Sequence, residues 1–104
     1  MNKSEKAQAR KLAKILKALS NEHRMALYME IARHGESDFE EPECNISEIV
    51  KFFTLSAPTI SHHLKELANA DLITTEKRGK HLVATINKDT LTRVREALAI
   101  IGGE

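Results

Sequence analysis

The spacing of apolar residues predicts two helices in the first third of the chain. Four residues follow the i, i+3, i+4, i+7 spacing of an amphipathic helix: Leu12, Ile15, Leu16 and Leu19. A second helix is expected to begin after Ser20 or Asn21, because either residue is a good N-cap. It should run to about His34, since Gly35 is a common helix terminator. We interpret the acidic stretch at residues 36–43 as a solvent-exposed loop.

Two shorter helices separated by a brief turn are expected next. The first begins near Asn45, which forms the spacing of a capping box with Glu48. Its apolar stripe consists of Ile46, Ile49, Val50 and Phe53. The second begins at Ser56 as N-cap and tolerates Pro58 in its first turn. The inner stripe of this second helix is Ile60, Leu64 and Leu67, and its outer side is Ala57, Ser61, His62 and Lys65.

After Asp71 the pattern changes from helical to extended. Residues 72–77 and 81–86 are rich in β-branched and apolar side chains and flank a basic Arg78-Gly79-Lys80 tip. This predicts a β-hairpin over about 72–87, in which Leu82, Ala84 and Ile86 share one face. A last helix is expected over 87–101, with a stripe of Leu91, Val94, Leu98 and Ile101. The expected fold is one domain over 1–104, mainly α, with five helices and a small β-hairpin.

Composition narrows the class of protein. A chain of 104 residues fits one domain, and 41% hydrophobic with 30% charged residues is typical of a folded chain. No apolar run reaches the roughly 18 residues that cross a bilayer, so we expect no membrane contact. The N-terminal residues lack the apolar core of a signal peptide. With a single cysteine, Cys44, the chain has no internal disulfide, and we expect a cytoplasmic protein.

The net charge of +1 says little about partners, but charge is unevenly distributed. Residues 1–24 carry seven basic and two acidic side chains, whereas residues 25–50 carry one basic and seven acidic ones. Residues 51–104 carry eight basic and six acidic side chains. The local field at a contact surface matters more than the total, so binding to a polyanion stays open.

The order of the later elements is that of a winged helix-turn-helix, whose second helix enters the major groove of DNA. Hydroxyls, an imidazole and a lysine on the helix that opens at Ser56 suit contacts to bases and phosphates. The basic hairpin tip suits the adjacent DNA backbone or minor groove. The residues expected to contact double-stranded DNA are Ser56, Ala57, Thr59, Ser61, His62, Lys65, Lys77, Arg78 and Lys80.

Several segments resemble the ArsR (arsenical-resistance repressor) family. Residues 18–24 resemble the start of its second helix, residues 55–67 its recognition segment, and residues 70–73 and 78–80 the turn and wing tip that follow. The resemblance implies a homodimer built from the first and last helices, and repression of an operon that a small ligand or metal relieves. The two apolar stripes also supply more apolar surface than one small core needs. We expect the dimer interface to contain Leu12, Ile15, Leu16, Leu19, Leu91, Val94, Leu98 and Ile101.

Three features depart from the family pattern. Asp71 replaces a glycine, although Asp tolerates a left-handed backbone better than most residues. Ala84 replaces an aromatic residue of the wing, and the loop before the third helix is several residues longer. His63, by contrast, matches a partly buried histidine of the family, and we expect it to pack against or orient the recognition helix.

The metal sites of the family lack their ligands in this sequence. The positions of its cysteine pair hold Asn45 and Ser47, and Cys44 alone precedes them. In the last helix Asp89 is present, but Leu91 stands where the first histidine is expected. Soft metals need two or more converging thiolates, so we expect no metal and no cofactor.

The leading hypothesis is therefore a sequence-specific, dimeric transcriptional repressor that binds a pseudo-palindromic operator. Two alternatives stay open: a winged-helix module that docks proteins, and an ArsR-type sensor with an unusual metal or thiol site. The existence and identity of a small-molecule inducer also stay open. We expect no enzyme, because no nucleophile, base and orienting residue occur at a recognisable spacing and there is no Gly-rich phosphate loop.

Overall fold

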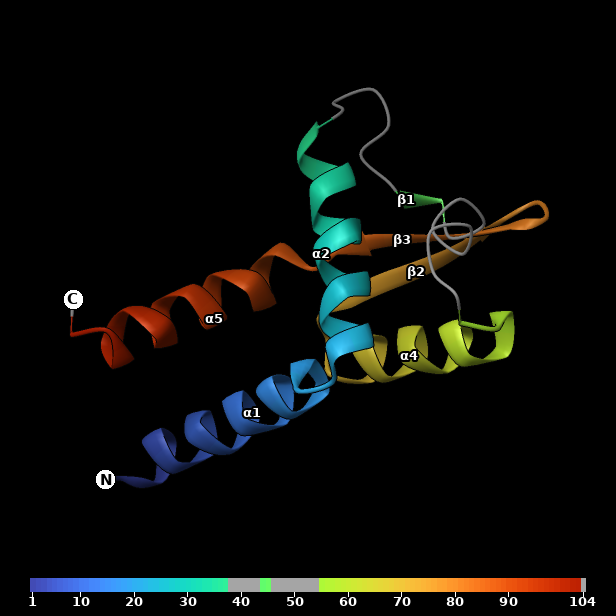
Figure 1. The fold of residues 1–104 in the computed structure, drawn as a ribbon. Helices are drawn as coiled ribbons and strands as arrows, with labels where there is room; N and C mark the ends of the chain where they lie inside the picture. The colour runs from blue at the N-terminus through green and yellow to red at the C-terminus, as the bar shows by residue number, and fades with distance from the viewer. Residues whose placement is uncertain (38–43, 46–54, 104) are drawn as a thin grey trace.

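A computed structural model describes residues 1–37, 44–45 and 55–103 of the chain (Figure 1). Its elements are α1 (Lys3–Leu19), α2 (Glu22–Ser37), β1 (Cys44–Asn45), α4 (Ala57–Asn69), β2 (Ile73–Arg78), β3 (His81–Ile86) and α5 (Lys88–Ile101). The described residues thus hold four helices, where the sequence predicted five. The helix that was predicted to begin near Asn45 falls outside the described residues, apart from its predicted N-cap Asn45, which lies in β1.

Side-chain caps explain where the first two helices begin. The Asn2 side chain accepts a hydrogen bond from the Glu5 backbone N–H at 2.8 Å and caps the start of α1. Between the helices, the Asn21 side chain accepts from the backbone N–H groups of His23 and Arg24, at 2.9 and 3.1 Å. Each cap satisfies donors that have no partner inside the helix. Of the two candidate caps for the second helix, Asn21 is the one used.

The predicted hairpin is confirmed, and it belongs to a three-stranded antiparallel sheet with the order β1-β3-β2. Ile73 pairs with Ile86 at one end of the hairpin and Arg78 pairs with His81 at the other. The third strand is the two-residue β1, where Cys44 pairs with Ala84. The sequence gives no sign of β1, because two residues are too few to show an alternating pattern.

The hydrophobic core gathers side chains from all four helices and from both hairpin strands. Its largest fully buried residues are Leu27, Ile31, Ile60, Leu64, Leu67, Leu72 and Ile73. The expected apolar face of β3 is confirmed for Ala84, which has no exposed surface, whereas Leu82 is 37% exposed. Leu82 lies near the hairpin tip, which projects beyond the helices in Figure 1, while its neighbour Val83 is buried.

The turn that ends α4 confirms the expectation for Asp71. Asp71 adopts a left-handed backbone with φ of +60°. Its N–H bonds to the Ala68 carbonyl and the Leu72 N–H bonds to the Leu67 carbonyl, both at 3.0 Å. This is the hydrogen-bond pattern of a Schellman motif, in which the residue after the C-cap is usually glycine. The turn places Leu72 in the core and directs the chain into β2.

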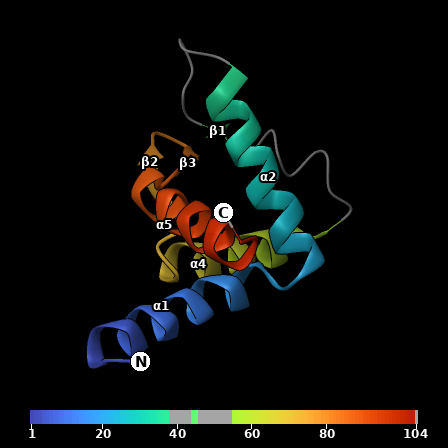
Figure 2. The same ribbon diagram turned by 90° about the vertical axis from the view of Figure 1, so that its left-hand side faces the viewer.

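The two ends of the molecule carry different elements. In Figure 1, α1 and α5 extend to one side and bring both chain termini there, while the start of α4 and the hairpin tip lie at the opposite end. Figure 2 shows the molecule from the side of the two termini, with α5 and α1 in front and α2 rising behind them. None of the helices in the described parts of the chain is long and apolar enough to cross a membrane.

Candidate nucleic-acid interface

The first turn of α4 is capped by its own hydroxyl groups. Ser56 is the N-cap, and its Oγ accepts from the Thr59 backbone N–H at 3.4 Å and lies 2.8 Å from Thr59 Oγ1. Pro58 fits at this point because the N–H groups of a first helical turn have no intrahelical acceptor. The predicted cap is confirmed. Ser56 and Thr59 therefore stabilise the helix start, which leaves Ser61 as the hydroxyl on the outer side that has no capping role.

The two sides of α4 separate as the spacing predicted. Ile60, Leu64 and Leu67 are at most 2% exposed and pack into the core. The outer side presents four exposed residues: Ala57, Ser61, His62 and Lys65. A helix fixed by one apolar stripe and exposed along the other side can enter a DNA groove without disturbing the core. The positive end of the helix dipole and Lys65 favour phosphate on this side.

The hairpin tip presents three basic side chains to solvent. Gly79 has φ of +58° and, with Lys80, makes the two-residue turn between β2 and β3. Lys77, Arg78 and Lys80 are all exposed, as predicted for a basic wing. An Arg78 guanidinium nitrogen lies 3.2 Å from a Glu76 carboxylate oxygen, so part of the charge at the tip is balanced within the strand.

The start of α4 and the hairpin tip lie at the same end of the molecule (Figure 1). The structure thus brings two predicted groups of residues, which are separated by more than ten positions in the sequence, to one end of the fold. Hydroxyl, imidazole and ammonium groups on a helix suit base edges and phosphates, and a basic tip suits the neighbouring DNA backbone. This end is the candidate nucleic-acid interface.

His63 lies on the inner side of α4 against the first turn of α2. Its side chain is buried at 8% exposure, and its Nδ1 has no hydrogen-bond partner among residues 1–37, 44–45 and 55–103. The ring of His23 is stacked against it, with centroids 6.2 Å apart and an interplanar angle of 27°. The ring of His62 lies 6.0 Å away at 48°. Packing of His63 against its neighbours was expected, but the contact with His23 was not.

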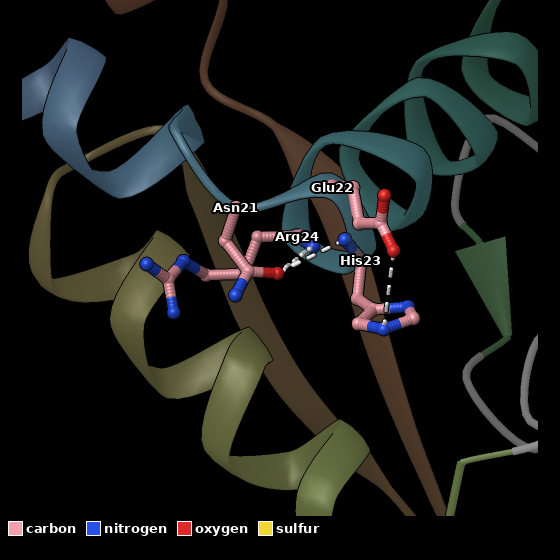
Figure 3. A network of polar contacts seen from close by, with 4 residues as sticks. All are labelled: Asn21, Glu22, His23 and Arg24. Atoms are coloured by element: carbon pink, nitrogen blue, oxygen red, sulfur yellow. Dashed lines mark hydrogen bonds and ion pairs between the residues drawn. The ribbon is translucent and has the colours of Figure 1, made fainter.

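The charges around His63 favour its neutral form. Burial is the main cause that lowers the pKa of His63 below its ordinary value, and Arg24, His62 and His23 lower the pKa further. Arg24 is held in place, because its Nε donates to the Ala18 carbonyl of α1 at 2.6 Å. Figure 3 shows this turn, with the Asn21 side chain capping α2 and the Arg24 and His23 side chains leaving in different directions. The His23 Nε2 atom also lies 3.8 Å from the Glu22 Oε1 atom.

The eight residues predicted for a dimer interface divide into three groups. Ile15, Leu19 and Val94 are buried in the core of the single chain. Leu12 and Leu91 are half-buried. Leu16, Leu98 and Ile101 are 38%, 54% and 72% exposed, and Ile100, which the stripe did not include, is 78% exposed. An amphipathic helix on a small domain serves its own core first, so only the outer residues of each stripe are free to contact another chain.

The residues at the positions of the family's metal ligands lie in different parts of the chain. Asn45 lies in β1, Ser47 lies outside the described residues, and Asp89 is exposed in the first turn of α5. Within the described parts of the chain, no group of three or more histidine, cysteine, aspartate and glutamate residues could hold a metal ion.

Comparison with known proteins finds similar sequences among bacterial regulatory proteins. The family model described as bacterial regulatory protein, arsR family, matches residues 39–75, which include α4 and the start of β2. An arsenical resistance operon repressor from Staphylococcus xylosus is 32% identical over 92 residues, which cover 88% of this chain and 81% of that protein. A repressor with the same description from Staphylococcus aureus has the same identity and coverage.

Solved structures share the fold. An ArsR-like transcriptional regulator from Rhodococcus sp. RHA1 superposes with a TM-score of 0.73 at 23% identity, over 93% of this chain and 84% of that one. A homodimeric winged helix-turn-helix DNA-binding domain from Mycobacterium bovis has a TM-score of 0.71 at 18% identity, over 100% of this chain and 89% of that one. The predicted winged helix-turn-helix fold class is confirmed by these likenesses.

Proposed function

This chain belongs to the arsR family of bacterial regulatory proteins, and from that premise we propose that it represses transcription by binding an operator as a homodimer. It is a DNA-binding transcriptional regulator, as its relatives are. In this proposal α4, the recognition helix, enters the major groove, and the wing tip (Lys77, Arg78 and Lys80) contacts the neighbouring backbone. In this proposal the protein works in the cytoplasm, where the chromosomal DNA of a bacterium lies.

The observation that carries the proposal is that the exposed outer side of α4 begins at the same end of the molecule as the basic wing tip (Figure 1). Ser61 and His62 can donate to or accept from base edges, while Lys65 lies one turn further along for a phosphate. Ser56 and Thr59 contribute by fixing the start of the helix. Ala57 offers a small apolar contact of the kind that a thymine methyl group accepts.

The dimer interface is proposed at the opposite end, and its candidate residues are the exposed apolar side chains that α1 and α5 carry: Leu16, Leu98, Ile100 and Ile101. Exposed large aliphatic side chains that lie close together on one helix, as Leu98, Ile100 and Ile101 do on α5, often mark a protein–protein interface. The Mycobacterium bovis domain with the same fold is homodimeric. Two recognition helices related by a two-fold axis would bind half-sites about one DNA turn, roughly 34 Å, apart.

Removing the wing charges tests the DNA-binding proposal against the protein-docking alternative. For the double variant Arg78→Ala, Lys80→Ala we expect affinity for DNA from upstream of the gene to fall at least about tenfold. The slope of log affinity against log salt should decrease by roughly two per protomer, because each phosphate contact contributes about one. Fluorescence anisotropy over a salt series measures both quantities.

The matched control removes two positive charges elsewhere. Lys88 and Arg93 are exposed on α5, which begins at the end of the hairpin opposite its tip. The double variant Lys88→Ala, Arg93→Ala should therefore leave the salt slope close to that of the unmodified protein. An unchanged slope in the wing variant, or an equal loss in both variants, would contradict a role of the wing in DNA contact and favour a docking surface for another protein.

A further inference from the structure

One contact between the recognition helix and α2 contains two histidines and an arginine. His63 of α4 is buried against the first turn of α2, where His23 stacks on its ring. The Arg24 side chain from the same turn is held at 2.6 Å from the Ala18 carbonyl at the end of α1. One turn of α2 therefore contacts both α1, at the dimer end, and α4, at the DNA end. We call His23, Arg24 and His63 the α2–α4 contact.

We propose that the α2–α4 contact positions the recognition helix for DNA, and that uptake of a proton at His63 weakens DNA binding. The inference rests on the function proposed above. His63 acts as a positioning residue, because its ring lies on the inner side of α4 and sets the helix against α2. The residues that contact DNA are its neighbours on the outer side, Ser61 and His62.

The neutral imidazole fits this contact and the imidazolium does not. Protonated His63 would place a second N–H donor, on Nδ1, where no acceptor lies among the described residues. Its charge would face Arg24 and, when they are protonated, His23 and His62. Arg24 has little freedom to move away, because its Nε is bonded to α1. A like charge in a buried site is costly, so protonation of His63 weakens the contact between α4 and this turn of α2.

The sign of the pH effect follows from the lowered pKa of His63. An unfolded histidine titrates near pH 6.5, and the folded one takes up its proton only at lower pH. The stability that neutral His63 contributes is thus complete above about pH 6.5 and is lost as the pH falls through the folded pKa. If DNA selects the arrangement with neutral His63, protons and DNA oppose each other, and each weakens binding of the other.

The first test compares the pH dependence of DNA binding in the unmodified protein and in His63→Gln, which is polar but cannot be protonated. We expect the affinity of the unmodified protein for a fluorescent duplex of its upstream region to fall about threefold more than that of H63Q between pH 7.5 and 5.5. This difference between the two proteins can be at most about tenfold at pH 5.5, because the pKa of His63 lies below about 6.5. The quantity to compare is how much more the affinity of the unmodified protein changes with pH than that of H63Q. The change in either protein alone is not informative, because the exposed histidines gain affinity for phosphate on protonation in both.

His34→Gln is the matched control, because His34 lies on α2 outside the α2–α4 contact and is not among the residues expected to contact DNA. H34Q should keep the loss of affinity at low pH that H63Q removes. The inference would be overturned if H63Q retained the acid-dependent loss, or if H34Q and H63Q changed it equally. A generally weakened helix would lower the affinity of H63Q at every pH without changing the pH profile, and that result too would overturn it.

The second test needs no variant and keeps the inference falsifiable if H63Q folds poorly. The imidazole ¹H and ¹³C shifts of the unmodified protein are followed by NMR against pH, with and without the duplex. We expect the pKa of His63 to be lower in the DNA complex than in the free protein. An equal or higher pKa of His63 in the complex would overturn the inference.

Different results would contradict the proposed function and the inference about the α2–α4 contact. Absence of duplex binding at every pH would contradict the proposed function, and with it any effect of His63 on DNA. Specific duplex binding with no contribution of His63 to its pH profile would leave the proposed function in place and remove only the inference about the α2–α4 contact.

Discussion

Replacing Leu98 and Ile101 together by glutamate is expected to separate the dimer and to remove nearly all operator binding. The two side chains are 54% and 72% exposed in the single chain, so the core should tolerate the change. Charges buried in an apolar interface without partners are strongly unfavourable. Loss of the second half-site removes the effective concentration that joins two weak contacts, which lowers affinity on the order of 100-fold or more. Sedimentation equilibrium and anisotropy measure the two effects.

Thr92→Glu provides the matched control for this double variant. Thr92 is exposed on the same helix, but it lies on a different side from the stripe of Leu91, Val94 and Leu98. It should sediment as a dimer and bind DNA normally. If Leu98→Glu, Ile101→Glu also sedimented as a dimer at micromolar concentration, the end formed by α1 and α5 would not be the dimer interface.

Leu67→Ala is expected to have the largest effect on folding. The Leu67 side chain is completely buried, at the point where α4 packs on the core and turns toward β2. Truncation of such a leucine costs about 2–5 kcal/mol, because the surrounding side chains only partly fill the cavity. A domain of this size is stable by only about 5–15 kcal/mol. Urea unfolding at a fixed protomer concentration should show the loss as a lower midpoint with a similar slope.

Leu82→Ala tests whether that loss follows from burial rather than from residue type. Leu82 is 37% exposed near the hairpin tip, so its truncation should cost less than about 1 kcal/mol. Equal destabilisation by the two leucine variants would contradict the placement of α4 on the core.

Much of α4 could be predicted from sequence because its signals are local. Ser56 as cap, Pro58 in the first turn and the spacing of Ile60, Leu64 and Leu67 define where the helix begins and which side is buried. The left-handed turn at Asp71 could be predicted as well, because the resemblance identified a position that requires positive φ.

The features that sequence reasoning missed depend on contacts between distant residues. Strand β1 exists through its pairing with Val83 and Ala84 and has too few residues for a pattern of its own. The contact of His23 with His63 joins residues forty positions apart on two helices. Likewise, the apolar stripes of α1 and α5 could not show which of their residues belong to the core, because that depends on which side of each helix the other elements cover.

The most direct test of the central claim, that α4 and the wing recognise an operator, is the specificity of DNA binding by the unmodified protein. Fluorescence anisotropy at roughly 0.15 M salt compares a duplex from upstream of the gene with a random duplex of equal length. A specific regulator should bind the first about a thousandfold more tightly or better. Equal affinity for both duplexes, with the same salt slope, would mean that the protein binds only phosphate and would contradict the claim.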